Sequence, residues 1–286
     1  RFRDQSKSAI AGQDGKWRVA LDALEAGGPD VLTIGDRKIE DVLVGDVWIG
    51  SGQSNMDMPV AAYVAGDPVL AAAAKENFPK IRLMKQGAKD VWREATPANI
   101  AGFSALLFSF GFPLQKELDV PVGLMVGAVG GTPSGFWLSE EMFRSDAACA
   151  EAAKKFATDS DYDALVAKHN QAQAKFDQDH AAWQALAEVA KQEGKQPPPA
   201  PRAPKPPVKP GEAGSGKIGQ LFEAYIRPYV GYGIKGVLWD QGESRTSIIG
   251  VDQVTLMGAL IGGWRKAWGQ GDFSFLYVQK PSGGGC

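Results

Sequence analysis

The chain has 286 residues, with 33 acidic and 31 basic side chains and a formal net charge of -2. This near balance gives no electrostatic case for binding nucleic acid or an anionic membrane. No apolar run approaches the roughly 20 residues of a membrane span. Two cysteines, Cys149 and Cys286, are too few for a disulfide scaffold. The length and the 44% hydrophobic content predict one large or two smaller globular domains.

Residues 1–44 are predicted to form part of a β-rich, sandwich-like domain. Apolar and polar residues alternate at 17–21, and two further runs at 31–34 and 39–44 are separated by a Gly-Asp turn. So few strands rarely stand alone, so we expect them to pack on the rest of the chain.

Residues 45–286 show a different pattern, in which short apolar runs end in glycine-rich loops and alternate with helical stretches. This alternation predicts an α/β domain with a parallel sheet covered on both faces. The predicted strands are 47–49, 81–84, 122–126, 236–239 and 273–278, and the clearest helices are 101–118 and 254–268. In such sheets the chemistry collects in loops at the carboxyl ends of the strands.

An insertion at 146–216 interrupts this domain. From Tyr162 to Ala190, mostly apolar residues recur in a 3-4-3-4 spacing, which predicts a long helix or helical hairpin with a heptad seam. Prolines then crowd residues 196–210, which we expect to be extended. The seam must bury against the domain, within its own hairpin or against a second copy of the chain, so the insertion is also a candidate oligomer contact.

Three strand-end motifs carry candidate chemistry. Residues 52–56 (Gly-Gln-Ser-Asn-Met) place Ser54 in a glycine-flanked turn, where a hydroxyl nucleophile and free backbone N–H groups could meet. Residues 127–133 contain paired glycines that allow close backbone approach. Residues 239–244 supply a side-chain amide and two carboxyl groups. Each motif alone also suits an ordinary polar turn, and the serine could simply cap a helix.

Together the three motifs, GDVWIGSGQSNM, VGAVGGTPSGFW and GVLWDQGES, resemble those of the sialate O-acetylesterase family of SGNH-type serine hydrolases. The resemblance covers nearly the whole chain. It implies a three-layer α/β/α domain that removes O-acetyl groups from sugars without a cofactor or metal, and it implies export to the periplasm or the extracellular space. An acetylated sugar or polysaccharide is the expected partner, with no role for nucleic acid or membrane.

The resemblance also assigns roles. It implies Ser54 as nucleophile, and an oxyanion hole formed by the Ser54 N–H, a glycine of the pair Gly130 and Gly131, and the Gln241 amide. Glu243 matches a position that relatives retain, and we group it with Ser54 as catalytic in a supporting role. The residues that we expect to contact substrate are Gln53, Asn55, Asp240 and Trp137.

The chain departs from the family pattern in several places. Asp240 stands where a tyrosine or histidine is usual, and Gly50 replaces a frequent cysteine. The family's Asp-x-x-His motif lies beyond the segment that matches residues 275–285. The remaining histidines, His169 and His180, both fall in the insertion. We therefore expect the domain to be incomplete at its C-terminal end and the chain as given to be nearly inactive.

Two alternatives stay open from the sequence. The same serine machinery would serve an acetylxylan esterase or another polysaccharide esterase. A carbohydrate-binding or scaffold protein on a degenerate hydrolase fold would instead use the helical insertion as its interaction surface. Acetate release separates the enzymes from the binding protein, and these residues do not identify the sugar.

Overall fold

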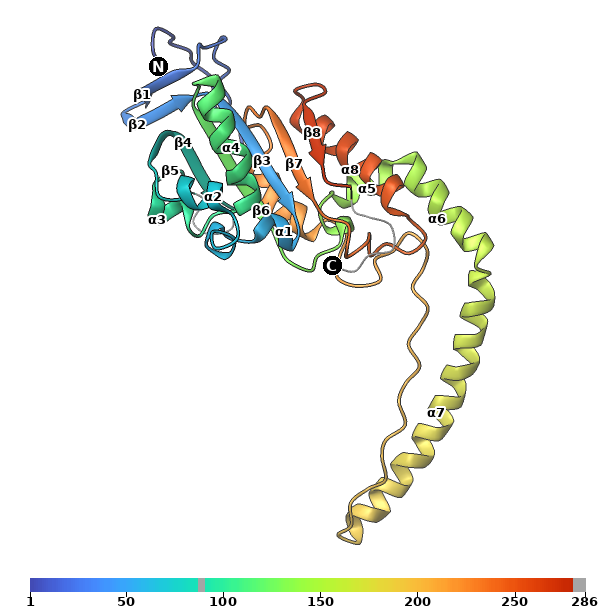
Figure 1. Ribbon diagram of the computed structural model, residues 1–286. Helices are drawn as coiled ribbons and strands as arrows, with labels where there is room; N and C mark the ends of the chain where they lie inside the picture. Colours follow the sequence, from blue (N-terminus) through green and yellow to red (C-terminus); the bar gives the residue numbers. More distant parts are fainter. Residues whose placement is uncertain (87–90, 280–286) are drawn as a thin grey trace.

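The structure, a computed structural model, describes residues 1–86 and 91–279, and its centre is a six-stranded sheet (Figure 1). The strands lie in the order β5-β4-β6-β3-β7-β8, and all neighbours are parallel except β4 and β5. Their bounds are β3 Asp46–Gly52, β4 Phe78–Lys85, β5 Arg93–Ala95, β6 Val122–Ala128, β7 Gly236–Asp240 and β8 Ser274–Tyr277. Each of the five predicted strands of this sheet is confirmed.

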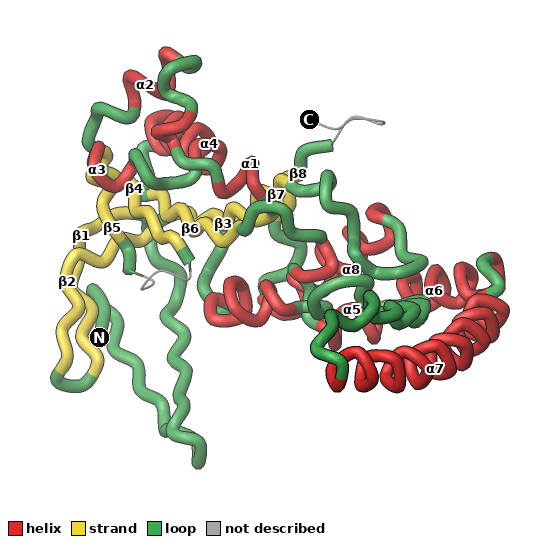
Figure 2. Tube along the Cα trace, turned by 90° about the horizontal axis from the view of Figure 1, so that it is seen from below, coloured by secondary structure: helices red, strands yellow, loops and turns green. Residues whose placement is uncertain are grey.

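Helices cover both faces of the sheet, so the predicted three-layer α/β/α fold is confirmed (Figure 2). On one face lie α1 Ser54–Asp57, α2 Pro68–Ala73, α3 Pro97–Ile100 and α4 Ala105–Leu118, with the 3-10 turn η1 Val60–Ala62. On the other face lie α5 Glu140–Ser145, α8 Gln253–Trp268, and the short turns η2 Ser134–Phe136, η3 Phe222–Ile226 and η4 Arg227–Tyr229.

The second face holds an aromatic core. Trp137, Trp239 and Trp264 are almost completely buried, and their rings meet edge to face at centroid distances of 6.3 and 6.2 Å. Large aromatic side chains bury much apolar surface and prefer this crossed geometry. The core therefore fixes β7 against α8 and against the loop that follows β6.

The N-terminal segment forms a hairpin of β1 Gly27–Ile34 and β2 Arg37–Val44, as predicted for runs 31–34 and 39–44. The predicted strand at 17–21 is wrong, because the structure gives these residues no strand and leaves Trp17 53% exposed. A strand needs a hydrogen-bonded neighbour, and alternation alone does not supply one.

The insertion forms an arm that extends away from the sheet (Figure 1). It begins with α6 Ala147–Asp159 and continues as α7 Tyr162–Gln192, which confirms the predicted helix. The proline-rich segment then runs back beside α7, with Trp183 Nε1 donating to the Pro198 carbonyl at 2.7 Å and the Tyr162 hydroxyl to the Pro207 carbonyl at 3.4 Å. Despite its length, α7 is polar, and no helix in the described part of the chain is long and apolar enough to cross a membrane.

The burial pattern of the arm has two matching periods. Along the proline-rich segment every third residue is half-buried, at Pro201, Pro204, Pro207 and Pro210, which is the repeat of a polyproline II helix. The residues of α7 that are half-buried are Tyr162, Val166, His169, Gln173, Phe176, His180, Trp183, Ala187 and Ala190. This stripe is spaced 4-3-4-3, so the predicted 3-4-3-4 seam is wrong at every second position, including the exposed Leu165 and Leu186.

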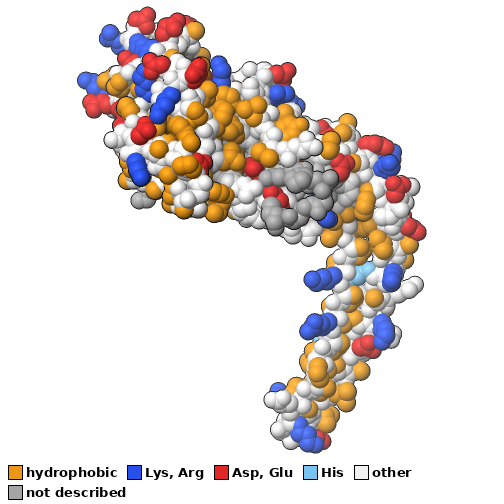
Figure 3. Space-filling view, in the orientation of Figure 1, with side chains coloured by type: hydrophobic (Ala, Val, Ile, Leu, Met, Phe, Trp, Pro, Cys, Tyr) orange, Lys and Arg blue, Asp and Glu red, His pale blue; other side chains and the backbone are white. Residues whose placement is uncertain are grey.

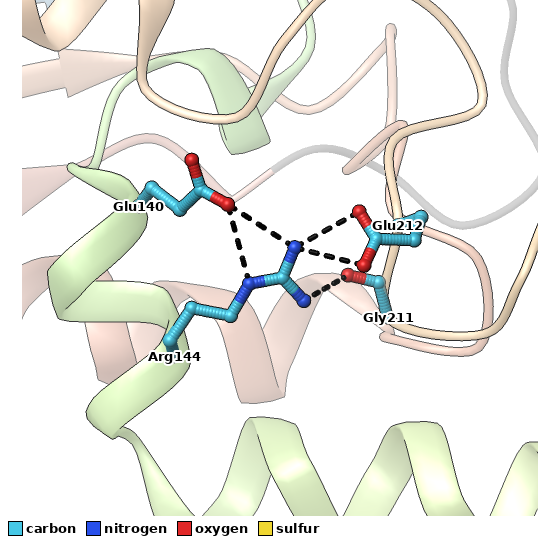
Figure 4. Close-up of polar contacts among 4 residues, drawn as sticks. All are labelled: Glu140, Arg144, Gly211 and Glu212. Atoms are coloured by element: carbon cyan, nitrogen blue, oxygen red, sulfur yellow. Dashed lines mark hydrogen bonds and ion pairs between the residues drawn. The ribbon is translucent and has the colours of Figure 1, made fainter.

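Arg144 joins the two ends of the insertion (Figure 4). From α5, its guanidinium bonds both carboxylate oxygens of Glu212 at 2.9 Å, the Gly211 carbonyl at 3.0 Å and Glu140 at 3.2 Å. The hydrogen bond to Glu212 is the largest of the contacts that raise the pKa of Arg144. Because Glu140 precedes the insertion and Glu212 lies near its C-terminal end, this cluster closes the base of the arm.

Candidate active site

Ser54 follows the central strand β3 at the carboxyl edge of the sheet. In the strand register, Gly52 pairs with Ala128 on one side and with Asp240 on the other. The ends of β3, β6 and β7 are therefore level, and the three motifs that follow them meet at one place. This is the position that the sequence predicts for Ser54.

Gly52 is the reason that the strands can approach so closely. Its φ is +130°, and a β-carbon there would lie 2.0 Å from the Asp240 carbonyl oxygen. Any side chain would therefore strain the backbone and push β3 away from β7. The Gln53 N–H then donates to that same carbonyl at 2.9 Å, which fixes the turn that carries Ser54.

The glycine loop after β6 lies against Ser54. A β-carbon on Gly130 would be 3.6 Å from the Ser54 β-carbon, whereas one on Gly131, whose φ is +71°, would meet nothing within 4 Å. The Val129 N–H donates to the Gly52 carbonyl at 3.3 Å and holds the loop in place. Ser54 begins α1, and the first N–H groups of a helix have no partner within it. The Met56 and Asp57 N–H groups donate to the Gln53 carbonyl at 3.0 and 3.1 Å, so the Ser54 N–H is the helix-start donor that we consider for an oxyanion.

Asn55 connects Ser54 to the third motif. Its amide nitrogen lies 3.4 Å from a carboxylate oxygen of Asp240 and 3.4 Å from one of Glu243. Asp240 is buried, and Glu243 is exposed. Two carboxyl groups of the third motif thus lie at the amide of the residue that directly follows Ser54.

Gln241 has partners different from those expected of an oxyanion donor. Its amide nitrogen donates to the carbonyls of Thr132 at 3.3 Å and Arg245 at 3.2 Å, and its oxygen accepts from the Gln253 amide at 3.0 Å. An amide nitrogen has only two hydrogens, so both are in use. In this geometry Gln241 ties two loops to α8 and does not offer a free N–H.

Gln253 and Ser134 complete this network, and neither stood out in the sequence. The Ser134 hydroxyl donates to the Gln253 oxygen at 2.9 Å, while the Ser134 and Gly135 N–H groups donate to the carbonyls of Arg245 and Thr246 at 3.0 Å. The bonds join residues more than 100 positions apart along the chain. No motif or spacing in the sequence draws attention to Gln253, which is the first residue of α8.

The expectation that Trp137 contacts substrate is corrected by its burial. Trp137 has no exposed surface, and its indole N–H donates to the Thr132 hydroxyl at 3.1 Å. Gln53 is also buried, and its side-chain oxygen has no hydrogen-bond partner among the described residues. Of the four residues expected to contact substrate, Asn55 and Asp240 line a cavity.

Both histidines lie on α7, which extends away from the sheet (Figure 1). His180 stacks between Phe176 and Trp183 at centroid distances of 5.3 and 5.6 Å. Neither imidazole is therefore positioned by the strand-end loops. Within residues 1–86 and 91–279, no three His, Cys, Asp or Glu side chains are grouped to hold a metal ion.

No family model matches the chain, but individual proteins do. Sialate O-acetylesterase of Rattus norvegicus is 27% identical over 96% of this chain, and that of Homo sapiens is 29% identical over 46% of it. The chain is similar to the sialate O-acetylesterases over almost its whole length. A crystal structure of a carbohydrate acetylesterase from Xanthomonas citri superposes with a TM-score of 0.64 and 25% identity, covering 98% of this chain. The chain spans 52% of the rat protein, 30% of the human protein and 52% of the Xanthomonas protein.

Proposed function

We propose that this chain is a carbohydrate O-acetylesterase in which Ser54 is the nucleophile. The observation that carries the proposal is the convergence of three strand-end loops, with Gly130 beside Ser54 and with Asn55, the next residue, hydrogen-bonded to two carboxyl groups. The names of the relatives support the carbohydrate ester as substrate class. Because the chain spans about half of the rat and Xanthomonas relatives, the activity is assigned here as a proposal.

In the proposed reaction, the Ser54 hydroxyl oxygen attacks the acetyl carbonyl carbon and passes its proton to solvent water, because neither histidine is positioned to accept it. The carbonyl oxygen becomes an oxyanion, for which the N–H groups of Ser54 and Gly130 are the proposed donors. Collapse of the tetrahedral intermediate releases the sugar hydroxyl, which takes up a proton. Water then attacks the acetyl-enzyme and releases acetate, which restores the serine.

The proposal gives Glu243 a supporting role through Asn55, whose amide lies 3.4 Å from its carboxylate. It gives neither histidine the role of base, because both are on the arm. A serine without a base keeps only the catalysis that the oxyanion hole and binding provide. We therefore expect slow turnover by residues 1–286, and no change when His169 and His180 are both replaced by alanine.

The test is Ser54→Ala, assayed by acetate release from p-nitrophenyl acetate and from a peracetylated sugar. We expect turnover to fall to the uncatalysed background, because the attacking oxygen is removed. The matched control is Ser145→Ala, an exposed serine on α5 that should leave turnover unchanged. Equal turnover by Ser54→Ala and the parent chain would refute the proposal, and sugar binding without Ser54-dependent turnover would favour a binding protein.

A further inference from the structure

A cavity of about 310 Å³ is lined in part by Asn55, the residue that follows Ser54, and by Asp240 at the end of β7. Its polar lining consists of Asn55, Tyr63, Asp67, Ser109 and Asp240, and the rest is aliphatic. Small-molecule sites have volumes of roughly 300–1,000 Å³, so this one suits a ligand of about one sugar ring. Because Asn55 directly follows the proposed nucleophile in the chain, we take this cavity as the candidate for holding the sugar ring of the substrate.

The walls of the cavity come from two segments that hydrogen bonds hold together. Residues 58–67 supply Tyr63 and Asp67, and the start of α4 supplies Ser109. The Val60 N–H donates to the Phe103 carbonyl at 2.8 Å, and the Ala105 N–H donates to the Met58 carbonyl at 2.9 Å. The cavity is therefore formed by regular backbone contacts and has defined walls.

The lining has the chemistry of a sugar site. Tyr63 is 43% exposed and offers an aromatic face, to which the apolar face of a sugar ring can pack. Asn55 and Ser109 can donate hydrogen bonds to hydroxyls, and the carboxylates of Asp67 and Asp240 can accept from them. Asp67 already uses one oxygen to cap α2, where it accepts from the Val69 and Leu70 N–H groups at 3.0 and 2.9 Å.

The charge of the lining is one-sided. Two side chains are carboxylates, and no described residue that lines the cavity is Lys or Arg. A lysine on the neighbouring strand β4, Lys85, is paired with Asp57 at 3.1 Å. A sialic acid brings its own carboxylate, which these groups would repel, while an uncharged sugar meets no such penalty.

We propose that this cavity binds the ring of an uncharged O-acetylated sugar and discriminates against sialic acid. Tyr63 is the stacking residue, and Asp67 is the residue that sets the charge preference. The inference rests on the proposed function only for the acetyl group, because ring binding is measurable without turnover. It narrows the substrate class from acetylated carbohydrates in general to neutral ones.

The experiment measures binding of two probes to residues 1–286 by saturation-transfer NMR: methyl β-D-glucopyranoside and N-acetylneuraminic acid. We expect the glucoside to bind more tightly. Tyr63→Ala should weaken its binding about tenfold, because the aromatic face is lost, and Tyr63→Phe should retain it. Asp67→Asn should lower the ratio of the two affinities, glucoside over N-acetylneuraminic acid, about threefold. The variant removes one negative charge that would repel the carboxylate of the acid, while asparagine still caps α2.

The control is Tyr232→Ala, a tyrosine of similar exposure that lines a different cavity, and it should change neither binding nor turnover. Tighter or equal binding of N-acetylneuraminic acid by the parent chain would overturn the inference, as would no detectable binding of either probe. Ser54-dependent hydrolysis of p-nitrophenyl acetate is measured in parallel. If the chain hydrolyses the ester but does not prefer the glucoside over N-acetylneuraminic acid, this inference alone is wrong. If it prefers the glucoside but shows no Ser54-dependent hydrolysis, the proposed function alone is wrong.

Discussion

The carboxyl edge of the sheet and the arm are built by different means. At the edge, β3 lies between β6 and β7 and is so close to the backbone of Asp240 in β7 that Gly52 has no room for a side chain. In the arm, α7 has no buried residue, and one stripe of half-buried side chains faces the proline-rich segment. Figure 3 shows Lys and Arg side chains spaced along the arm between patches of hydrophobic ones.

This difference indicates which substitutions should affect the whole domain and which should have only a local effect. At the edge, each residue depends on partners from distant parts of the chain, so one change is transmitted to all three loops. In the arm, regular helix and polyproline geometry need few long-range contacts, so a change should stay local. The next three predictions test this contrast, in order of decreasing effect.

The largest effect is expected for Gly52→Ala. The new β-carbon would lie 2.0 Å from the Asp240 carbonyl oxygen at a φ of +130°. Overpacking and backbone strain each cost about 1–3 kcal/mol, so the free energy of unfolding should fall by roughly 2–6 kcal/mol in urea titrations. The same change would displace Ser54 from Gly130.

The control for this prediction is Gly35→Ala, which has a φ of +57° but nothing within 4 Å of the added carbon. This variant introduces backbone strain at a positive φ without a steric clash, so it should lower the free energy of unfolding by about 1 kcal/mol. Equal effects of the two variants would show that the close contact of β3 with β7 is not what stabilises the edge.

A smaller but clear effect is expected for Gln241→Ala. The variant removes three hydrogen bonds of a buried amide, each contributing about 1 kcal/mol, so the free energy of unfolding should fall by about 2–3 kcal/mol. Gln253→Ala should cost less, because it leaves both Gln241 donor bonds in place. A loss of turnover with unchanged stability would instead restore Gln241 as an oxyanion donor.

Most of the sheet could be predicted, because its strands are apolar runs that end at glycines. The meeting of Ser54 with Gly130 could also be predicted from strand order, since parallel strands bring their carboxyl ends to one edge. The hydrogen bonds that occupy the side-chain amide of Gln241 could not be predicted. Sequence shows that an amide is present at a strand end, but the carbonyls of Thr132 and Arg245 reach it only through the path of two loops.

The arm shows the same limit in another form. Its helix follows from composition, but the choice between a 3-4 and a 4-3 stripe depends on what covers the helix. The covering segment has the three-residue burial repeat of a polyproline II helix, and its Pro207 and Pro198 carbonyls accept hydrogen bonds from Tyr162 and Trp183, two residues of the half-buried stripe. A heptad count assumes a helical partner and therefore selects alternate positions wrongly.

The smallest global effect is expected for Trp183→Ala. Its indole donates to the Pro198 carbonyl at 2.7 Å and stacks on His180, so the variant should release the proline-rich segment from the tip of α7. The free energy of unfolding of the sheet domain should change by less than about 0.5 kcal/mol, because nothing in α7 is buried. Limited trypsin digestion should instead become faster after Lys195 and Arg202, two basic residues of this segment that are not followed by proline.

Leu186→Ala is the matched control, since Leu186 is on the same helix but 60% exposed and outside the stripe. It should alter neither the digestion rate nor the unfolding curve. If Trp183→Ala lowered the stability of the whole chain as much as Gln241→Ala, the arm would be coupled to the sheet and the contrast would fail. If digestion stayed slow, the Arg144 cluster at the base of the arm would be sufficient to hold the segment, because it bonds Gly211 and Glu212 directly after the last proline.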